Sequence, residues 1–218
     1  MLFRKSTSAL VVLAVTAIAS GAMIVSASTT INQVGSDLDG EAAGDYSGFS
    51  VSLSSDGTEF AIGAYFNDGA NGADSGHVRV YEWNGTAWVQ KGIDIDGEAA
   101  GDQSGHSVSL SSDGTEVAIG APYNDGTGSN SGHVRVYEWN GSTWQQKGTD
   151  IDGEVAGDES GYSVSLSSDG TIVAIGAPGN DGTGAGAGHV RVYEWNETAW
   201  VQTGTDINGE VAGDESGY

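Results

Sequence analysis

Carboxylates spaced two residues apart are the most chemically suggestive feature of this sequence. Asp94, Asp96 and Glu98 alternate with an isoleucine and a glycine, and Asp102 follows four residues later. Alternating oxygen ligands around a glycine turn can hold calcium, although this spacing differs from that of the helix–loop–helix calcium site. The alternative is a solvated turn in which Asp side chains accept hydrogen bonds from their own backbone N–H groups.

The same acidic motif occurs four times along the chain, and three of the copies supply the candidate metal ligands. These carboxylates are Asp39, Glu41, Asp45, Asp96, Glu98, Asp102, Asp152, Glu154 and Asp158. The fourth copy, at 206–214, carries Asn208 where the others carry an aspartate. Calcium is therefore the one cofactor that the sequence suggests, and the metal loop and the self-capped turn both stay open.

The remaining polar residues give no pattern of catalysis. His77, His133 and His189 occupy the same point of a repeat, and three copies of one catalytic histidine are not expected in a single chain, so we interpret them as structural. The sequence has no cysteine, no His-Glu-x-x-His motif and no Gly-x-Ser-x-Gly motif. We therefore expect a protein that is not an enzyme.

The acidic motif belongs to a longer repeat. Asp45, Asp102, Asp158 and Asp214 mark equivalent points, at successive spacings of 57, 56 and 56 residues. Each complete unit has two short β-branched runs joined by Ser-Asp-Gly, as in GHSVSLSSDGTEVAIGAP at 105–122. A period of this size is typical of propellers and repeat arrays.

One repeat is expected to form four short strands, because its apolar residues alternate and no helical period occurs. In the second unit these strands are Ser107–Leu110, Thr115–Ala121, His133–Trp139 and Thr143–Lys147. Asn140-Gly141 favours a two-residue hairpin turn, which would pair Tyr137 with Trp144. The predicted fold is all-β: a propeller-type array of four-stranded antiparallel blades, with about three blades present and the ring incomplete.

The motif IGAP, preceded by GYSVS and followed by a Gly-rich loop and VRVYEW, resembles the FG-GAP repeat of integrin α-subunit propellers and related surface proteins. The resemblance covers 31–218 and implies blades that usually number seven. Calcium-binding members of that family carry several aspartates between the first two strands. Here that loop has one acid per unit, Asp56, Asp113 or Asp169, so these copies resemble the calcium-free blades of the family.

The segment Met1–Ala27 has the pattern of a secretory signal peptide. Arg4 and Lys5 precede the apolar run Ala9–Val25, and small residues follow. An uncleaved membrane anchor is the alternative. The predicted divisions are a signal peptide at 1–27, a stray fourth strand (Ile31–Val34) with an acidic linker at 28–47, blades at 48–104, 105–160 and 161–216, and the start of a truncated fourth repeat at 217–218.

The charge balance restricts the partners. The chain has 30 Asp and Glu against 7 Lys and Arg, with a formal net charge of −23, and both nucleic acid and anionic lipid require basic surfaces. We therefore expect no nucleic-acid partner, and membrane attachment only through an uncleaved leader. Glycosylation sequons stand at three equivalent turns, Asn84, Asn140 and Asn196, and would matter in a host that modifies secreted asparagine.

Together these features predict a secreted or cell-surface interaction or adhesion module. The resemblance implies an extracellular protein or carbohydrate ligand, and open blade edges predict self-association. Two alternatives remain: a non-catalytic part of a larger secreted hydrolase or lyase, and a purely structural spacer.

Overall fold

The computed structural model describes residues 15–17, 23–25 and 32–218, and the chain divides into two units, Met1–Ser36 and Asp37–Tyr218. In the first unit, β1 (Val15–Ala17) and β2 (Met23–Val25) pair antiparallel. The rest of the predicted signal peptide lies outside the described residues. Within the part of the chain that is described, no helix has the length and apolar character needed to cross a membrane.

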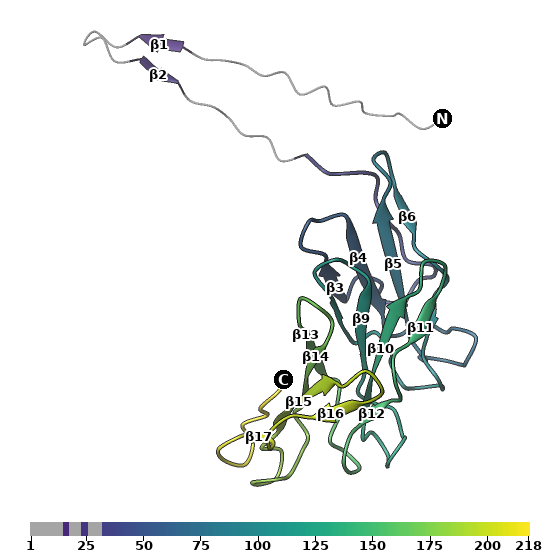
Figure 1. Cartoon of the computed structure of the whole chain (residues 1–218), viewed down its shortest axis with the longest axis vertical. Coiled ribbons are helices and arrows are strands. Elements are labelled where there is room, and N and C mark those ends of the chain that lie inside the picture. Colours follow the sequence, from purple (N-terminus) through teal and green to yellow (C-terminus); the bar gives the residue numbers. More distant parts are fainter. Residues whose placement is uncertain (1–14, 18–22, 26–31) are drawn as a thin grey trace. The chain divides into compact units, whose positions relative to one another are not determined.

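The second unit consists of three antiparallel sheets with the same strand order, as the repeat predicts (Figure 1). The first sheet contains β3 (Ser50–Leu53), β4 (Glu59–Ala64), β5 (His77–Trp83), β6 (Trp88–Gln90) and β7 (Ile95–Asp96). The second contains β8 (Ser107–Leu110), β9 (Glu116–Ala121), β10 (His133–Trp139), β11 (Trp144–Gln146) and β12 (Ile151–Asp152). The third contains β13 (Ser163–Leu166), β14 (Ile172–Ala177), β15 (His189–Trp195), β16 (Trp200–Gln202) and β17 (Ile207–Asn208). Each sheet is one blade of an incomplete β-propeller.

The outer strand of each blade is broken into two pieces, which the sequence analysis did not foresee. In the second blade, β11 pairs with one end of β10 and β12 pairs with the other end. The break falls at Gly148, whose φ of +83° a residue with a side chain rarely adopts. The predicted fourth strand, Thr143–Lys147, is therefore only the first piece, and the second piece carries the acidic linker back along the blade.

The predicted pairing of Tyr137 with Trp144 is wrong. Trp139 pairs with Trp144, and Tyr137 lies opposite Gln146. The connection is a four-residue loop, 140–143, because the side-chain oxygen of Asn140 accepts hydrogen bonds from the backbone N–H groups of Ser142 and Thr143. This Asx turn replaces the two-residue turn and shifts the register by two residues.

The hydrophobic core lies between neighbouring blades. Between the first and second blades it contains Ala61, Val78, Val80, Ile95, Val108, Leu110, Val117, Ile119, Tyr137 and Trp144. A second cluster joins the second and third blades in the same way. Since each sheet buries its apolar side chains against the next sheet, stability depends on stacking, as in other repeat proteins.

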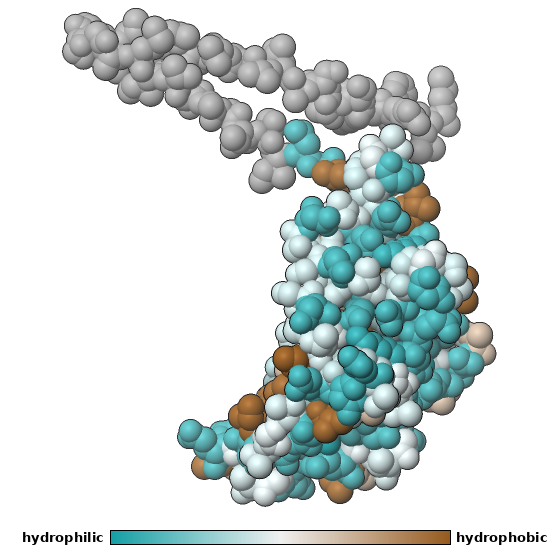
Figure 2. Space-filling view, viewed as in Figure 1, coloured by the Kyte–Doolittle hydropathy of each residue, from teal (hydrophilic) through white to brown (hydrophobic). Residues whose placement is uncertain are grey.

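The outer face of the first blade is exposed. Val51 and Leu53 of β3 are 66% and 61% exposed, whereas the equivalent Val108 and Leu110 of β8 are 9% and 7% exposed. The sequences of the two strands are identical, so the difference comes from packing: β8 packs against the first blade, whereas this face of β3 has no described blade against it. On the face shown in Figure 2, hydrophobic residues of 37–218 stand as separate patches in a largely hydrophilic surface.

The stray fourth strand expected at Ile31–Val34 is not formed in its described part. Residues 32–34 lie outside any strand, and Val34 is 58% exposed.

Candidate functional site

The last aspartate of each acidic linker caps its own turn. Asp102 is buried, and one of its carboxylate oxygens accepts hydrogen bonds from the backbone N–H of Ala99 and the side-chain amide of Asn124, both at 3.0 Å. Asp45 and Asp158 make the equivalent bonds in the other linkers. This is the self-capped turn that the sequence left open as one alternative.

The backbone carbonyl oxygen of the middle aspartate of each linker accepts a hydrogen bond from an arginine. The guanidinium of Arg135, in β10, donates to the carbonyl oxygen of Asp96 at 2.8 Å and lies over the ring of Tyr137. Arg79 and Arg191 bind the carbonyl oxygens of Asp39 and Asp152 in the same way. Burial, with the charge of Asp94 adding to it, raises the pKa of the Asp96 carboxyl. The arginine therefore ties each linker to the following blade.

The glutamate of each linker faces a histidine of the next blade. His133 Nδ1 lies 3.8 Å from Glu98 and 3.9 Å from Asp150, which belongs to the following linker. The histidine is only 1% exposed, and burial, together with the charge of Arg135, lowers its pKa to about 4. The equivalent groups are Glu41, His77 and Asp94 in the first blade and Glu154, His189 and Asp206 in the third.

The structure thus divides the nine predicted ligands among three environments. The aspartates of the turn caps accept hydrogen bonds within their own turns, and those of the arginine contacts accept through their carbonyl oxygens. The glutamates join a histidine and the first aspartate of the next linker. Sequence reasoning missed this grouping, because recurrence of the histidine at the start of the third strand does not show which carboxylates meet it. Calcium binding by the linkers stays a prediction.

Aromatic residues line up across the three blades. Phe49, His106, Tyr162 and Tyr218, here called the aromatic file, occupy the position just before the first strand of successive repeats. Their ring centroids are 5.2, 4.5 and 4.6 Å apart along the series. The first strands of neighbouring blades lie side by side, and so the rings that precede them meet.

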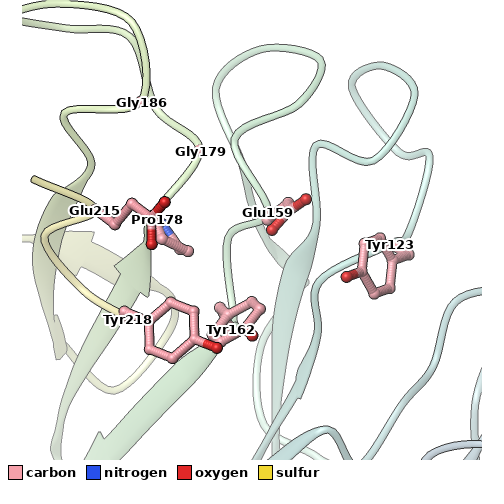
Figure 3. A pocket seen from close by; sticks show the side chains of 8 residues that line it. All are labelled: Tyr123, Glu159, Tyr162, Pro178, Gly179, Gly186, Glu215 and Tyr218. Atoms are coloured by element: carbon pink, nitrogen blue, oxygen red, sulfur yellow. The ribbon is translucent and has the colours of Figure 1, made fainter. Parts of the chain in front are cut away.

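A pocket of about 290 Å³ opens beside one end of the aromatic file. In Figure 3, Tyr162 and Tyr218 lie next to each other, with Glu215 and Pro178 on one side and Glu159 and Tyr123 on the other. Burial, and next the charge of Glu215, raises the pKa of Glu159. A hydrogen bond with Tyr218 and burial raise that of Tyr162. The pocket thus combines flat aromatic faces with two carboxyl groups, which suits a ligand that has both apolar faces and hydroxyl groups.

The three sequons lie at exposed turns. The side-chain oxygens of Asn84, Asn140 and Asn196 each accept a hydrogen bond from a backbone N–H of their own turn. Their local role is therefore turn formation.

Comparison with known families gives a match to the FG-GAP repeat at 89–137 and 143–193. The chain contains FG-GAP repeats. The first matched repeat begins in β6 of one blade and ends in β10 of the next, so the sequence unit straddles two sheets. FG-GAP repeats build propeller-type interaction modules and are typical of extracellular or surface proteins. None of the curated proteins matches this FG-GAP chain.

Solved structures with a similar fold include a crystal structure of a putative 6-phosphogluconolactonase from Bacteroides uniformis, at 14% identity and a TM-score of 0.51, over 72% of this chain and 39% of that one. Sqt1 of Saccharomyces cerevisiae (12% identity, TM-score 0.47, 76% of this chain and 37% of that one) is also similar. Hydrazine synthase of Kuenenia stuttgartiensis is similar as well, at 12% identity and a TM-score of 0.47, over 81% of this chain and 42% of that one. The FG-GAP chain thus spans about two fifths of the structures it matches, and the likeness concerns the fold alone.

Proposed function

We propose that this FG-GAP chain is a non-enzymatic binding module, secreted or displayed at a cell surface, and that carbohydrate binds along the aromatic file. The observation that carries this proposal is the continuous series of rings, one per repeat, which ends at the pocket beside Tyr218. The pattern of the leader and the usual setting of FG-GAP repeats support export.

The chemistry of the aromatic file suits a sugar chain. Phe49 is 53% exposed, so its ring offers an open face on which the apolar side of a sugar ring can stack. Glu159 and Glu215 add hydrogen-bond acceptors for hydroxyl groups at the pocket. The formal net charge of −23 favours a neutral or cationic oligosaccharide over an acidic one.

A protein ligand is the nearest competing interpretation, because exposed aromatic residues are also common in protein interfaces. A second competing interpretation is that the chain is a non-catalytic part of a larger secreted hydrolase or lyase. The two glutamates of the pocket occupy a position that varies along the chain, as Tyr46, Gln103, Glu159 and Glu215, whereas each neighbouring ring is part of the repeat. The repeated feature is the aromatic file, and repetition suits an extended binding surface better than a single reaction centre.

Binding to an array of neutral, amino and acidic oligosaccharides, with immobilised matrix proteins as a second panel, tests this proposal on the full chain. We expect capture of neutral or amino oligosaccharides, and about two- to tenfold weaker binding for Tyr218→Ala, since one stacked ring contributes about 0.5–1.5 kcal/mol. Ile93→Thr is the matched control, because Ile93 is 80% exposed and the equivalent residues 149 and 205 are threonine.

Capture of matrix protein alone, lost in Tyr218→Ala, would replace carbohydrate by a protein ligand. Binding that is unaffected by Tyr218→Ala would remove the aromatic file from the proposal. Export is checked separately by mass spectrometry of the secreted product, whose mature chain is expected to begin near Ser28. A product that still carries Met1–Val25 would instead indicate an anchor.

A further inference from the structure

Three equivalent groups of side chains remain outside the proposed carbohydrate surface. Each consists of a glutamate from one linker, a histidine at the start of the third strand and an aspartate from the next linker. The groups are Glu41, His77 and Asp94; Glu98, His133 and Asp150; and Glu154, His189 and Asp206. Within each group, one potential ligand atom from every residue lies within 4.8 Å of the others.

The histidines are buried and have ring nitrogens for which the described residues provide no hydrogen-bond partner. His77, His133 and His189 are each 1% exposed. Nε2 of all three has no hydrogen-bond partner, and at His189 Nδ1 has none either. The Nδ1 atoms of His77 and His133 face two carboxylates at 3.8 and 3.9 Å, distances too long for hydrogen bonds. A buried Nδ1 that makes no hydrogen bond has a free-energy cost, which a metal ion bound at that nitrogen would offset, whereas the same ion would not reach Nε2.

We propose that each of these three groups binds a divalent transition-metal ion, with Zn²⁺ as the best fit, through one imidazole nitrogen and two carboxylate oxygens. Zn²⁺ accepts imidazole and carboxylate ligands together, whereas Ca²⁺ takes oxygen ligands. Three protein ligands leave one tetrahedral position for water or another donor.

The spacing of the ligand atoms fits an ion of this size. Two atoms that each lie about 2.0–2.2 Å from a tetrahedral Zn²⁺ are about 3.3–3.6 Å apart. At His133 the separations from Nδ1 to the two carboxylates are 3.8 and 3.9 Å, and all three ligand atoms lie within 4.8 Å of one another, so an inward movement of up to about 1 Å completes the site. The side chains of Glu98 and Asp150 are 43% and 30% exposed, which leaves them room to make that movement.

The neighbouring arginine holds the glutamate in position. Arg135 Nη1 lies 3.6 Å from Oε1 of Glu98, while Oε2 of the same carboxylate faces His133. Arg79 and Arg191 lie near Glu41 and Glu154 in the same way. Because the arginine uses one oxygen, the other stays directed at the imidazole, as outer partners commonly orient metal ligands.

The sites would act as clamps between blades. Glu98 precedes the second blade, His133 belongs to its third strand and Asp150 lies between β11 and β12 of the same blade, so one ion would fix the preceding linker and the broken outer strand to that third strand. The sequence has no cysteine, so metal clamps would supply cross-links of the kind that disulfides supply in many exported proteins.

Zinc binding to the full chain, stripped of metal by a chelator, tests the proposal by calorimetry with Zn²⁺ alone. We expect about three Zn²⁺ per chain, and affinity at least tenfold weaker in D94N/D150N/D206N. The control E82Q/E138Q/E194Q removes the same charge from the far ends of the same third strands and should bind as the native chain does. E41Q/E98Q/E154Q, which changes half-exposed side chains, provides a second loss-of-ligand variant if the first does not fold.

Histidine NMR signals distinguish coordination by the imidazoles from binding of Zn²⁺ to surface carboxylates alone. Zn²⁺ should shift the ring signals of His77, His133 and His189 and leave those of His106 unchanged. Absence of Zn²⁺ binding, or equal binding by the ligand variants and the charge control, would overturn the proposal. Binding of Ca²⁺ without Zn²⁺ would also overturn it and would favour an oxygen-only site in the linkers.

Discussion

The indole Nε1 of Trp144 donates a 2.8 Å hydrogen bond to the carbonyl oxygen of Lys91, which lies 53 residues earlier and in the preceding blade. Trp200 makes the same bond to Lys147, so the contact is a repeated feature of the interface between blades. The buried Trp144 side chain thus both donates a hydrogen bond to the preceding blade and packs in the core between the two blades. The interface between blades, rather than any single sheet, therefore determines stability.

Trp144→Ala should lower the free energy of unfolding by about 3–5 kcal/mol, because the ring is 8% exposed and lies in the core between the first two blades. Asn140→Ala removes only exposed bonds within the turn and should cost about 1 kcal/mol. Urea denaturation measures both values. Equal losses would mean that the indole is not an interblade contact.

Leu110→Ala should cost about 2–4 kcal/mol, whereas Leu53→Ala should cost less than about 1 kcal/mol. The two leucines stand in identical SVSL strands, but Leu110 is 7% and Leu53 is 61% exposed. Denaturation of the two variants side by side measures the difference. A large loss at Leu53 would show that its face is covered in solution, and sedimentation at several concentrations would then reveal self-association of this chain.

The buried pair of Lys147 and Glu116 should behave as one unit. Lys147 Nζ lies 2.5 Å from a carboxylate oxygen of Glu116, and burial raises the pKa of that carboxyl, with Lys147 opposing the shift. The third blade replaces both partners together, with Ile172 and Thr203.

Lys147→Thr alone should therefore cost about 3–5 kcal/mol, since it leaves a buried carboxylate without its partner. The double variant E116I/K147T copies the third blade and should lose much less. Thermal melting of the single and double variants provides the comparison. Additive losses would contradict the coupling of the two residues.

Acid should weaken the turn that contains Asp169. Hydrogen bonds from the side chains of Ser167 and Thr171, and from the backbone of Thr171, lower the pKa of this carboxyl to about 2 from its usual 3.8. A lowered carboxyl pKa stabilises the fold fully above the unfolded value, and this stabilisation is lost as the pH falls from about 4 towards 2.

Carboxyl NMR titration should therefore place the midpoint for Asp169 near 2, and Asp169→Asn should reduce the acid dependence of stability in that window. The asparagine keeps the acceptor oxygen but has no charge to titrate. A midpoint at or above 3.8 would show that the turn does not form as described.

Local sequence alone determined the repeat, the all-β class and most of the strands. The predicted strands Ser107–Leu110 and His133–Trp139 agree with β8 and β10 residue for residue. Alternation of apolar and polar side chains depends on a period of two within a few residues, so it can be read without knowledge of the neighbours. The aspartate-capped turns could be read for the same reason, because each cap bonds its own loop.

Only the tertiary structure decided which of these residues meet. Glu98, His133 and Asp150 come from a linker, a strand and the next linker, and nothing in their local sequence indicates a common location. The shift from Tyr137 to Trp139 as the partner of Trp144 depended on the two backbone N–H groups that bind the side-chain oxygen of Asn140. Leu53 and Leu110 stand in the same four-residue strand sequence, yet one is exposed and the other buried, because burial depends on the blade that packs alongside.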